Sequence, residues 1–192
     1  MKVILFGATG MVGQGVLREC LLDPEVESVL TIGRRGTGQQ HEKLREIVHQ
    51  DFFDFSAIES QLAGYDACFF CLGVSSAGMK EEEYRRLTYD ITLAAAQALA
   101  RQNPGMMTFL YVSGTGTDSS EKGPLHGITS STKWTRVLYA VMGPLYPVWK
   151  TLFPKYVTTT EQLGRAMIRV AKHGAPQPIL ENQDLARLTT PS

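Results

Sequence analysis

The sequence has little cysteine, no net charge and no uninterrupted apolar run long enough to span a membrane. Among its 192 residues, 19 Lys and Arg offset 19 Asp and Glu. Balanced charge gives no overall attraction to nucleic acid or to an anionic membrane surface, so we expect neither as a partner. The most apolar stretch, residues 134–153, is broken by Gly143, Pro144 and Pro147, and therefore does not predict a membrane span.

The sequence also begins without the pattern of a secretory signal peptide. Met1 and Lys2 lead directly into an apolar strand, rather than into a charged region, an apolar stretch and a cleavage site. We therefore expect a cytoplasmic protein. The length is that of one domain able to bury its own core.

The three cysteines are Cys20, Cys68 and Cys71. Cys68 and Cys71 have the C-x-x-C spacing of redox and metal sites, but they lie in an apolar run, ACFFCL, typical of a buried strand. Residues three apart on a strand face opposite sides, so these thiols should not meet. We interpret them as core residues and predict no metal site.

The stretch that organises the chain is residues 3–13, which read VILFGATGMVG. An apolar strand is followed by Gly7, Gly10 and Gly13, and then by a helical pattern to about Leu22. In a dinucleotide-binding turn, such glycines permit the sharp turn, the approach of a pyrophosphate to the backbone, and close packing of the helix on the strand. The phosphates bind at the helix N-terminus. The alternative is an ordinary strand-turn-helix without a ligand. We predict cofactor contacts from Gly7, Thr9, Gly10, Met11, Val12 and Gly13.

A second strand, residues 28–32, ends at Gly33, Arg34 and Arg35. In a dinucleotide fold the end of this strand meets the adenosine ribose, where an acid binds the 2′-hydroxyl and arginine accepts a 2′-phosphate. No acid is present here, and guanidinium groups suit a phosphate. We therefore predict that NADP(H) is preferred over NAD(H), which remains an option. The alternative is a solvated pair of loop arginines.

The next segments complete an alternation of strands and helices. Residues 37–46 are polar and loop-like, with a short helix at most, and residues 47–49 suggest a third strand. Asp51 and Phe52 follow it, where they could contact an adenine, although Phe52 could equally belong to the core. Residues 56–62 suggest a helix with a Ser56/Glu59 capping box.

A fourth strand, residues 65–71, is followed by Leu72 and Gly73 in a small-residue loop expected beside the cofactor. A long helix over 80–102 and a fifth strand over 108–112 come next, and Ser113 follows that strand. The pattern predicts an α/β fold, a Rossmann-type doubly wound parallel sheet flanked by helices.

Together, the GATGMVG turn, the strand ending in Gly33-Arg34 and the YVSG segment at 111–114 resemble the atypical and extended short-chain dehydrogenase/reductases. The nearest subgroup is NAD(P)-binding and epimerase/dehydratase-like, similar to the Tat-interacting oxidoreductase-like proteins. The resemblance implies that Ser113 hydrogen-bonds the reacting carbonyl or hydroxyl. It also implies a tyrosine for proton transfer and a lysine four residues later, which lowers the pKa of that tyrosine.

No Tyr-x-x-x-Lys lies between Ser113 and residue 134, so the chain departs from this family pattern. About thirty residues, roughly one helix and one strand, would be missing. Tyr146 and Lys150 do have the spacing, but Pro147 interrupts the helical turn that would align them, and we interpret the pair as coincidental. A helix opening near Pro147 stays open as an alternative.

The domain organisation follows from this comparison. Residues 1–118 are expected to form the dinucleotide-binding core, and residues 119–192 a shortened substrate or lid region of the same domain, with a small C-terminal helical part. Within it, Thr158 and Glu161 have capping-box spacing for a helix to Ala171, followed by a polar tail with at most one short strand. Exposed apolar area in residues 134–153 could support a homodimer.

Two functions fit these observations. The first is an NADP(H)-binding oxidoreductase or epimerase acting on an unidentified small molecule, with impaired catalysis. The second is a non-catalytic protein that senses NADP(H) or serves as a scaffold.

Overall fold

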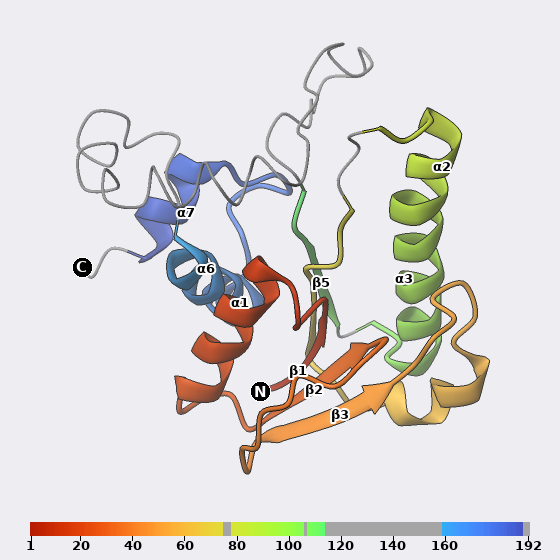
Figure 1. The fold of residues 1–192 in the computed structure, drawn as a ribbon. Coiled ribbons are helices and arrows are strands. Elements are labelled where there is room, and N and C mark those ends of the chain that lie inside the picture. The colour runs from red at the N-terminus through yellow and green to blue at the C-terminus, as the bar shows by residue number, and fades with distance from the viewer. Residues whose placement is uncertain (75–77, 106, 114–158, 190–192) are drawn as a thin grey trace.

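The computed structural model describes residues 1–74, 78–105, 107–113 and 159–189. Its centre is a parallel sheet of five strands in the order β3-β2-β1-β4-β5 (Figure 1). The strands are β1 (Lys2–Phe6), β2 (Ser28–Gly33), β3 (Leu44–Val48), β4 (Ala67–Phe70) and β5 (Thr108–Tyr111). Because all five are parallel, their carboxyl ends meet at one edge, which is where open α/β sheets bind ligands.

Helices cover both faces of this sheet, which confirms the predicted doubly wound fold. On one face lie α1 (Met11–Leu22) and α6 (Thr160–His173). On the other lie the 3₁₀ helix η1 (Ser56–Leu62) and a continuous helix made of α2 (Glu81–Arg85), the π-turn η2 (Arg86–Asp90) and α3 (Ile91–Gln102). A short helix, α7 (Asn182–Thr189), follows α6.

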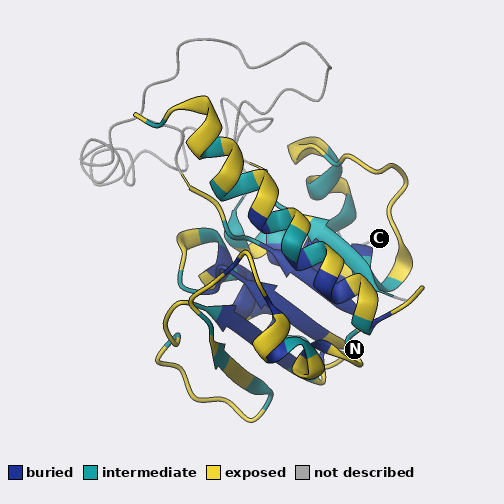
Figure 2. Cartoon of the chain, turned by 90° about the vertical axis from the view of Figure 1, so that its right-hand side faces the viewer, coloured by how far each residue is buried: buried dark blue, intermediate teal, exposed yellow. Residues whose placement is uncertain are grey.

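The core consists of two apolar layers that share the same strands. Ile4 and Phe6 pack toward α3, while Val3 and Leu5 pack toward α1. Figure 2 shows the central strands fully buried between the helices. Alternate side chains of a parallel strand point to opposite faces, so a sheet covered twice needs continuous apolar runs, as in VILF of β1.

The cysteines lie in these layers as predicted. Cys68 belongs to the layer beneath α3, whereas Cys20 and Cys71 belong to the layer beneath α1. All three are free thiols. Burial raises the pKa of Cys71 to about 12, so this thiol is protonated at neutral pH and is a poor nucleophile.

Helices α1 and α6 approach closely because each presents a glycine to the other. A Cβ on Gly15 would lie 2.3 Å from the Cβ of Thr160, and one on Gly164 would lie 3.0 Å from the Cβ of Glu19. The buried Glu19 carboxylate accepts a hydrogen bond of 3.0 Å from Arg165 Nε. The C-terminal helical part is thereby joined to the first helix of the Rossmann core.

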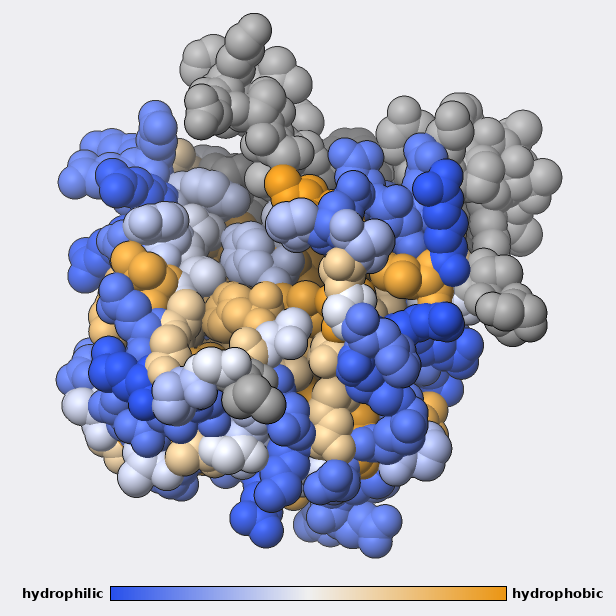
Figure 3. Space-filling view, turned by 180° about the vertical axis from the view of Figure 1, so that it is seen from behind, coloured by the Kyte–Doolittle hydropathy of each residue, from blue (hydrophilic) through white to orange (hydrophobic). Residues whose placement is uncertain are grey.

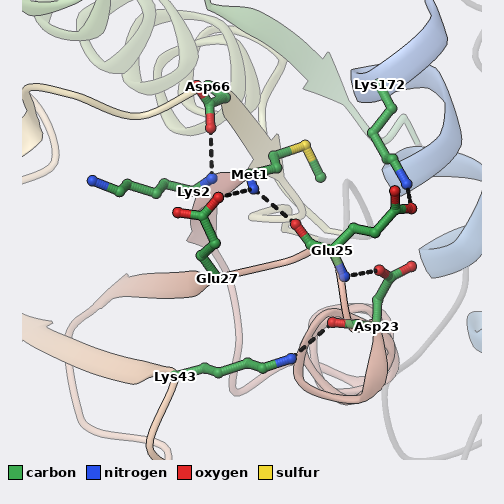
Figure 4. A network of polar contacts seen from close by, with 8 residues as sticks. All are labelled: Met1, Lys2, Asp23, Glu25, Glu27, Lys43, Asp66 and Lys172. Atoms are coloured by element: carbon green, nitrogen blue, oxygen red, sulfur yellow. Dashed lines mark hydrogen bonds and ion pairs between the residues drawn. The ribbon is translucent and has the colours of Figure 1, made fainter.

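A polar network lies at the amino ends of the strands, opposite the carboxyl ends where a ligand is expected (Figure 4). The Met1 ammonium donates to the carbonyl of Glu25 at 2.7 Å and to Glu27 Oε1 at 2.8 Å. Lys172 of α6 forms an ion pair with Glu25, and Lys2 N donates to Asp66 Oδ2 at 2.6 Å. These contacts link α6 to the turn after α1 at the edge away from the expected cofactor site.

The predicted start of the third strand was wrong. Strand β3 begins at Leu44 rather than at residue 47, and so includes Arg45 and Glu46, which were expected in a loop. Both side chains are exposed because β3 is an edge strand that pairs only with β2, and an edge strand tolerates polar residues.

Two capping predictions were also wrong. Helix η1 has no side-chain cap, and Glu59 instead accepts from Arg101 Nε at 2.7 Å. The capping box of α6 exists one residue later than predicted, between Thr159 and Gln162. The tail forms helix α7 rather than a strand. The apolar stretch 134–153, with Tyr146 and Lys150, lies outside the described residues.

Candidate nucleotide-binding cleft

A cleft of about 430 Å³ opens where β1, β2 and β4 end. The turn after β1, the end of β2 and the turn after it, and single residues following β3 and β4 form its walls. The lining residues are Gly7, Ala8, Thr9, Thr31, Ile32, Gly33, Arg34, Arg35, Thr37, Phe52 and Leu72. The cleft therefore lies at the edge predicted for a dinucleotide, with the glycine turn on one side and the arginine pair on another.

Two of the motif glycines are required by the protein itself. Gly7 has a φ of 80°, and a Cβ there would lie 2.6 Å from the carbonyl oxygen of Cys71. A Cβ on Gly13 would lie 2.0 Å from the carbonyl oxygen of Gly7. Any side chain at either position would collide with backbone atoms. The turn can therefore pack closely against α1 and the end of β4 only because both positions are glycine.

Gly10 differs from the other two. It is exposed, its φ of −78° and ψ of 163° are open to any residue, and a Cβ there would meet only the Gly7 carbonyl oxygen, at 3.3 Å. Gly10 is the N-cap of α1 and supplies no side-chain cap. The first N–H groups of a helix have no partner within the helix, so those of Met11, Val12 and Gly13 are available to an anion.

The turn that follows β2 carries the predicted arginines. Arg34 and Arg35 both line the cleft and are exposed, and neither takes part in an ion pair within the part of the chain that the structure describes. Two guanidinium groups without an ion-pair partner among the described residues therefore line one side of the cleft. Gly7, Ala8 and Thr9 line another side, while Gly10, Met11, Val12 and Gly13 at the start of α1 follow them in the chain and are not among the lining residues. Guanidinium groups and helix N-termini both favour negative charge.

The residues after β3 have unequal positions. Phe52 lines the cleft but is also buried in the core, with its ring 6.2 Å from Phe6 and 6.0 Å from Phe55. Asp51 is not among the lining residues, and its Oδ1 accepts a hydrogen bond from Phe53 N at 2.9 Å. Contact of Asp51 with an adenine stays a prediction.

The strands β4 and β5 deliver the remaining predicted residues. Leu72 lines the cleft, and Gly73 follows it in an exposed position. Ser113 is exposed and lies beyond β5, which is paired to β4 through the hydrogen bond of Val112 N to Phe70 O. Ser113 is not among the lining residues, so its catalytic role stays a prediction, as does that of Tyr146 and Lys150.

Strand β5 forms the second edge of the described sheet. Phe109 and Leu110 are half-buried and Tyr111 is exposed. Figure 3 shows apolar side chains gathered in the middle of this back face, between α3 on one side and α6 and α7 on the other. A homodimer stays a prediction.

Sequence reasoning missed five lining residues, namely Ala8, Thr31, Ile32, Gly33 and Thr37. Thr31 had a detectable signal, because it is the polar residue within the apolar run 29–32 of β2. The structure shows that it is buried. Its hydroxyl donates to Glu46 Oε2 at 3.2 Å. Thr37 had no such signal, since its place in the wall depends on the path of the turn after β2.

This geometry agrees with a comparison of the sequence with protein families. A model described as NAD(P)H-binding matches residues 7–162, which begin at the first motif glycine and include the cleft. The chain belongs to the NAD(P)H-binding family.

Several known proteins resemble this NAD(P)H-binding chain. Protein FMP52 of Meyerozyma guilliermondii is 27% identical over 157 residues, which cover 76% of this chain and 65% of that protein. The corresponding protein of Emericella nidulans is 31% identical, over 61% of this chain and 52% of its own length. The chain thus spans less than two thirds of these relatives. Both are named mitochondrial proteins, which contradicts the expected cytoplasmic location.

A solved structure supports the fold. A short chain dehydrogenase family protein from Francisella tularensis superposes with a TM-score of 0.61 at 11% identity, covering 90% of this chain and 91% of that one. At this identity the similarity establishes the Rossmann architecture alone.

The described residues also bear on membrane and metal binding. No helix among them is both long and apolar enough to cross a bilayer. Within the same ranges, no three His, Cys, Asp or Glu side chains gather as a metal site would require.

Proposed function

We propose that this protein binds NADP(H) in the cleft and is an oxidoreductase- or epimerase-type member of short-chain dehydrogenase/reductase descent with impaired catalysis. The observation that carries the proposal is the pair of unpaired guanidinium groups, Arg34 and Arg35, at the end of β2. The end of this strand meets the adenosine ribose in a dinucleotide fold, and the 2′-phosphate distinguishes NADP(H) from NAD(H) there.

The residues present fit such a cofactor. The diphosphate would bind the N–H groups at the start of α1 beside Gly10, and the 2′-phosphate would bind Arg34 and Arg35. When bound, the nicotinamide supplies hydride transfer at its C4 atom. Ser113 would orient the carbonyl or hydroxyl oxygen of a small-molecule substrate, with residues 1–118 as the cofactor core and residues 119–192 as a substrate or lid region.

Impaired catalysis follows from the sequence after Ser113. Proton transfer by a phenol near neutral pH needs a neighbouring cation to lower a pKa that is ordinarily about 10. No Tyr-x-x-x-Lys follows Ser113 before residue 134, and Pro147 interrupts the pair formed by Tyr146 and Lys150. The same observation favours a second candidate function, a protein that senses NADP(H) or serves as a scaffold without turnover.

The test is a fluorescence titration of wild type and Arg34→Ala with NADPH and NADH. We expect wild type to bind NADPH at least tenfold more tightly, and Arg34→Ala to lose most of that preference while its NADH affinity is kept. Arg45→Ala is the matched control, because Arg45 is an exposed arginine of β3 outside the cleft. Equal affinities of wild type for both cofactors would refute the NADP(H) proposal.

Turnover distinguishes the two functions. A panel of carbonyl compounds and nucleotide sugars is incubated with NADP(H) and the full chain, NADPH oxidation is followed by absorbance, and conversion of the sugars is followed by chromatography. An epimerase returns the hydride that it takes, so it converts a sugar without net oxidation of the cofactor. Binding with neither oxidation nor sugar conversion supports the sensing or scaffolding function, whereas either reaction, if it is lost in Ser113→Ala, supports the enzyme.

A further inference from the structure

The turn over residues 33–37 carries both cleft arginines, yet its own sequence does little to hold it in one conformation. It reads GRRGT, is mostly exposed, and contains two glycines, which lose the most conformational freedom on ordering. A phosphate site built on such a turn binds weakly unless other residues hold the backbone in place before the ligand arrives.

The hydrogen bonds that hold this turn come from β3 and the residues immediately after it. His49 N donates to the Gly33 carbonyl at 2.9 Å, and Gln50 Nε2 donates to the Arg34 carbonyl at 2.8 Å. Thr37 N donates to Glu46 Oε2 at 2.7 Å. Both ends of the turn are therefore held, one of them by a carboxylate on the neighbouring strand.

Glu46 also joins the turn to the buried part of β2. The same Oε2 atom accepts from Thr31 Oγ1 at 3.2 Å, and Thr31 is the direct cross-strand neighbour of Glu46. Thr31 and Thr37 both line the cleft. One oxygen atom thus holds two wall residues, one on each side of the arginines.

We propose that Glu46 and Gln50 are positioning residues that set the preference of the cleft for a 2′-phosphorylated dinucleotide. Neither residue is among those that line the cleft. They hold the backbone of the 33–37 turn so that Arg34 and Arg35 stand at the ribose end of the cleft before binding. The inference rests on the proposed NADP(H) function and deepens it, because it assigns the selectivity to side chains of β3 and its following loop.

The mechanism predicts a selective effect. Only NADPH has a 2′-phosphate that meets the arginines, so loosening the turn weakens NADPH and leaves NADH almost unchanged. Loss of fold stability would instead weaken both cofactors alike. Acceptor chemistry matters more than charge at position 46, because both contacts of Glu46 are hydrogen bonds that a glutamine oxygen can accept.

The experiment compares Kd for NADPH and NADH in wild type, Glu46→Ala, Glu46→Gln and Gln50→Ala, with melting temperatures measured in parallel. Glu46→Ala and Gln50→Ala should each lower the NADPH preference at least threefold, and Glu46→Gln should keep it. Glu42→Ala is the control, an exposed glutamate before β3. If Glu46→Ala does not fold, Gln50→Ala alone decides, because its side chain is exposed.

The outcomes separate this inference from the function on which it rests. A wild type without NADPH preference refutes the proposed function and this inference with it. A wild type that prefers NADPH, together with an unchanged preference in both alanine variants, refutes only the positioning role. An equal loss of both cofactors in these variants also refutes it, since that result indicates a structural role alone.

Discussion

At the scale of single residues, the glycine motif separates into two kinds of position. At Gly7 and Gly13 a side chain is excluded, because a Cβ atom would lie within 2.6 Å of backbone atoms. Gly10 faces only the Gly7 carbonyl, and its φ is open to any residue. Backbone packing therefore explains the first two glycines but not the third, for which the role we propose is to let a diphosphate approach the main chain.

Gly10→Asp tests this distinction. Aspartate is a favourable N-cap, so the melting temperature should stay the same or rise, whereas a carboxylate at the diphosphate site should weaken NADPH binding at least tenfold. The measurement is a fluorescence titration beside a thermal melt. Gly10→Asn is the matched control of similar size and capping ability without the charge. NADPH affinity in Gly10→Asp equal to that of wild type would count against a diphosphate site there.

At the scale of elements, the contact between α1 and α6 decides how the C-terminal part is attached. Gly15 and Gly164 remove the side chains that would keep the two helices apart, and the buried Glu19 pairs with Arg165 across the contact. The capping-box spacing at Thr158 and Glu161 predicted a helix to Ala171. It could not predict the partner, because the sequence distance from Glu19 to Arg165 is 146 residues.

Gly164→Val tests this contact. A Cβ at this position would already lie 3.0 Å from Glu19 and 3.2 Å from the Cα of Val16, so we expect a loss of about 1–3 kcal/mol in the free energy of unfolding through overpacking. Urea denaturation measures it. The control is Ala100→Val at an exposed position of α3, where only helix propensity changes, by roughly 0.5 kcal/mol. Equal losses in the two variants would mean that α1 and α6 do not pack as described.

At the scale of the whole molecule, the cofactor should stabilise the fold, because a ligand that binds only the native state shifts unfolding by mass action. NADPH at one hundred times its Kd should add about 2.7 kcal/mol, which raises the melting temperature of a domain of this size by roughly 5–10 °C. Differential scanning calorimetry with NADPH, NADH and no ligand measures the shift. An equal shift from NADH at the same concentration would argue against the preference for NADP(H).

Much of the architecture was predictable from sequence because its signals are local. Apolar runs such as VILF and the glycine turn each act within a few residues, and the alternation of strand and helix patterns predicted five strands in a doubly wound sheet. Boundaries failed where tertiary contacts outweigh local pattern. The polar residues at the start of β3 form a strand because they pair with β2. Glu59 does not cap η1, because its carboxylate accepts a hydrogen bond from Arg101 instead.

The sequence by itself determined the order of strands and helices and the place of the cleft, because parallel strands bring the turns after them to one edge. Only the tertiary structure decided which glycines the surrounding backbone requires and which residues hold the arginine turn. Both depend on atoms from separate segments: Cys71 O against Gly7, and Glu46 Oε2 beside Thr31 and Thr37. Such contacts arise from strand pairing in three dimensions, and no local sequence pattern records them.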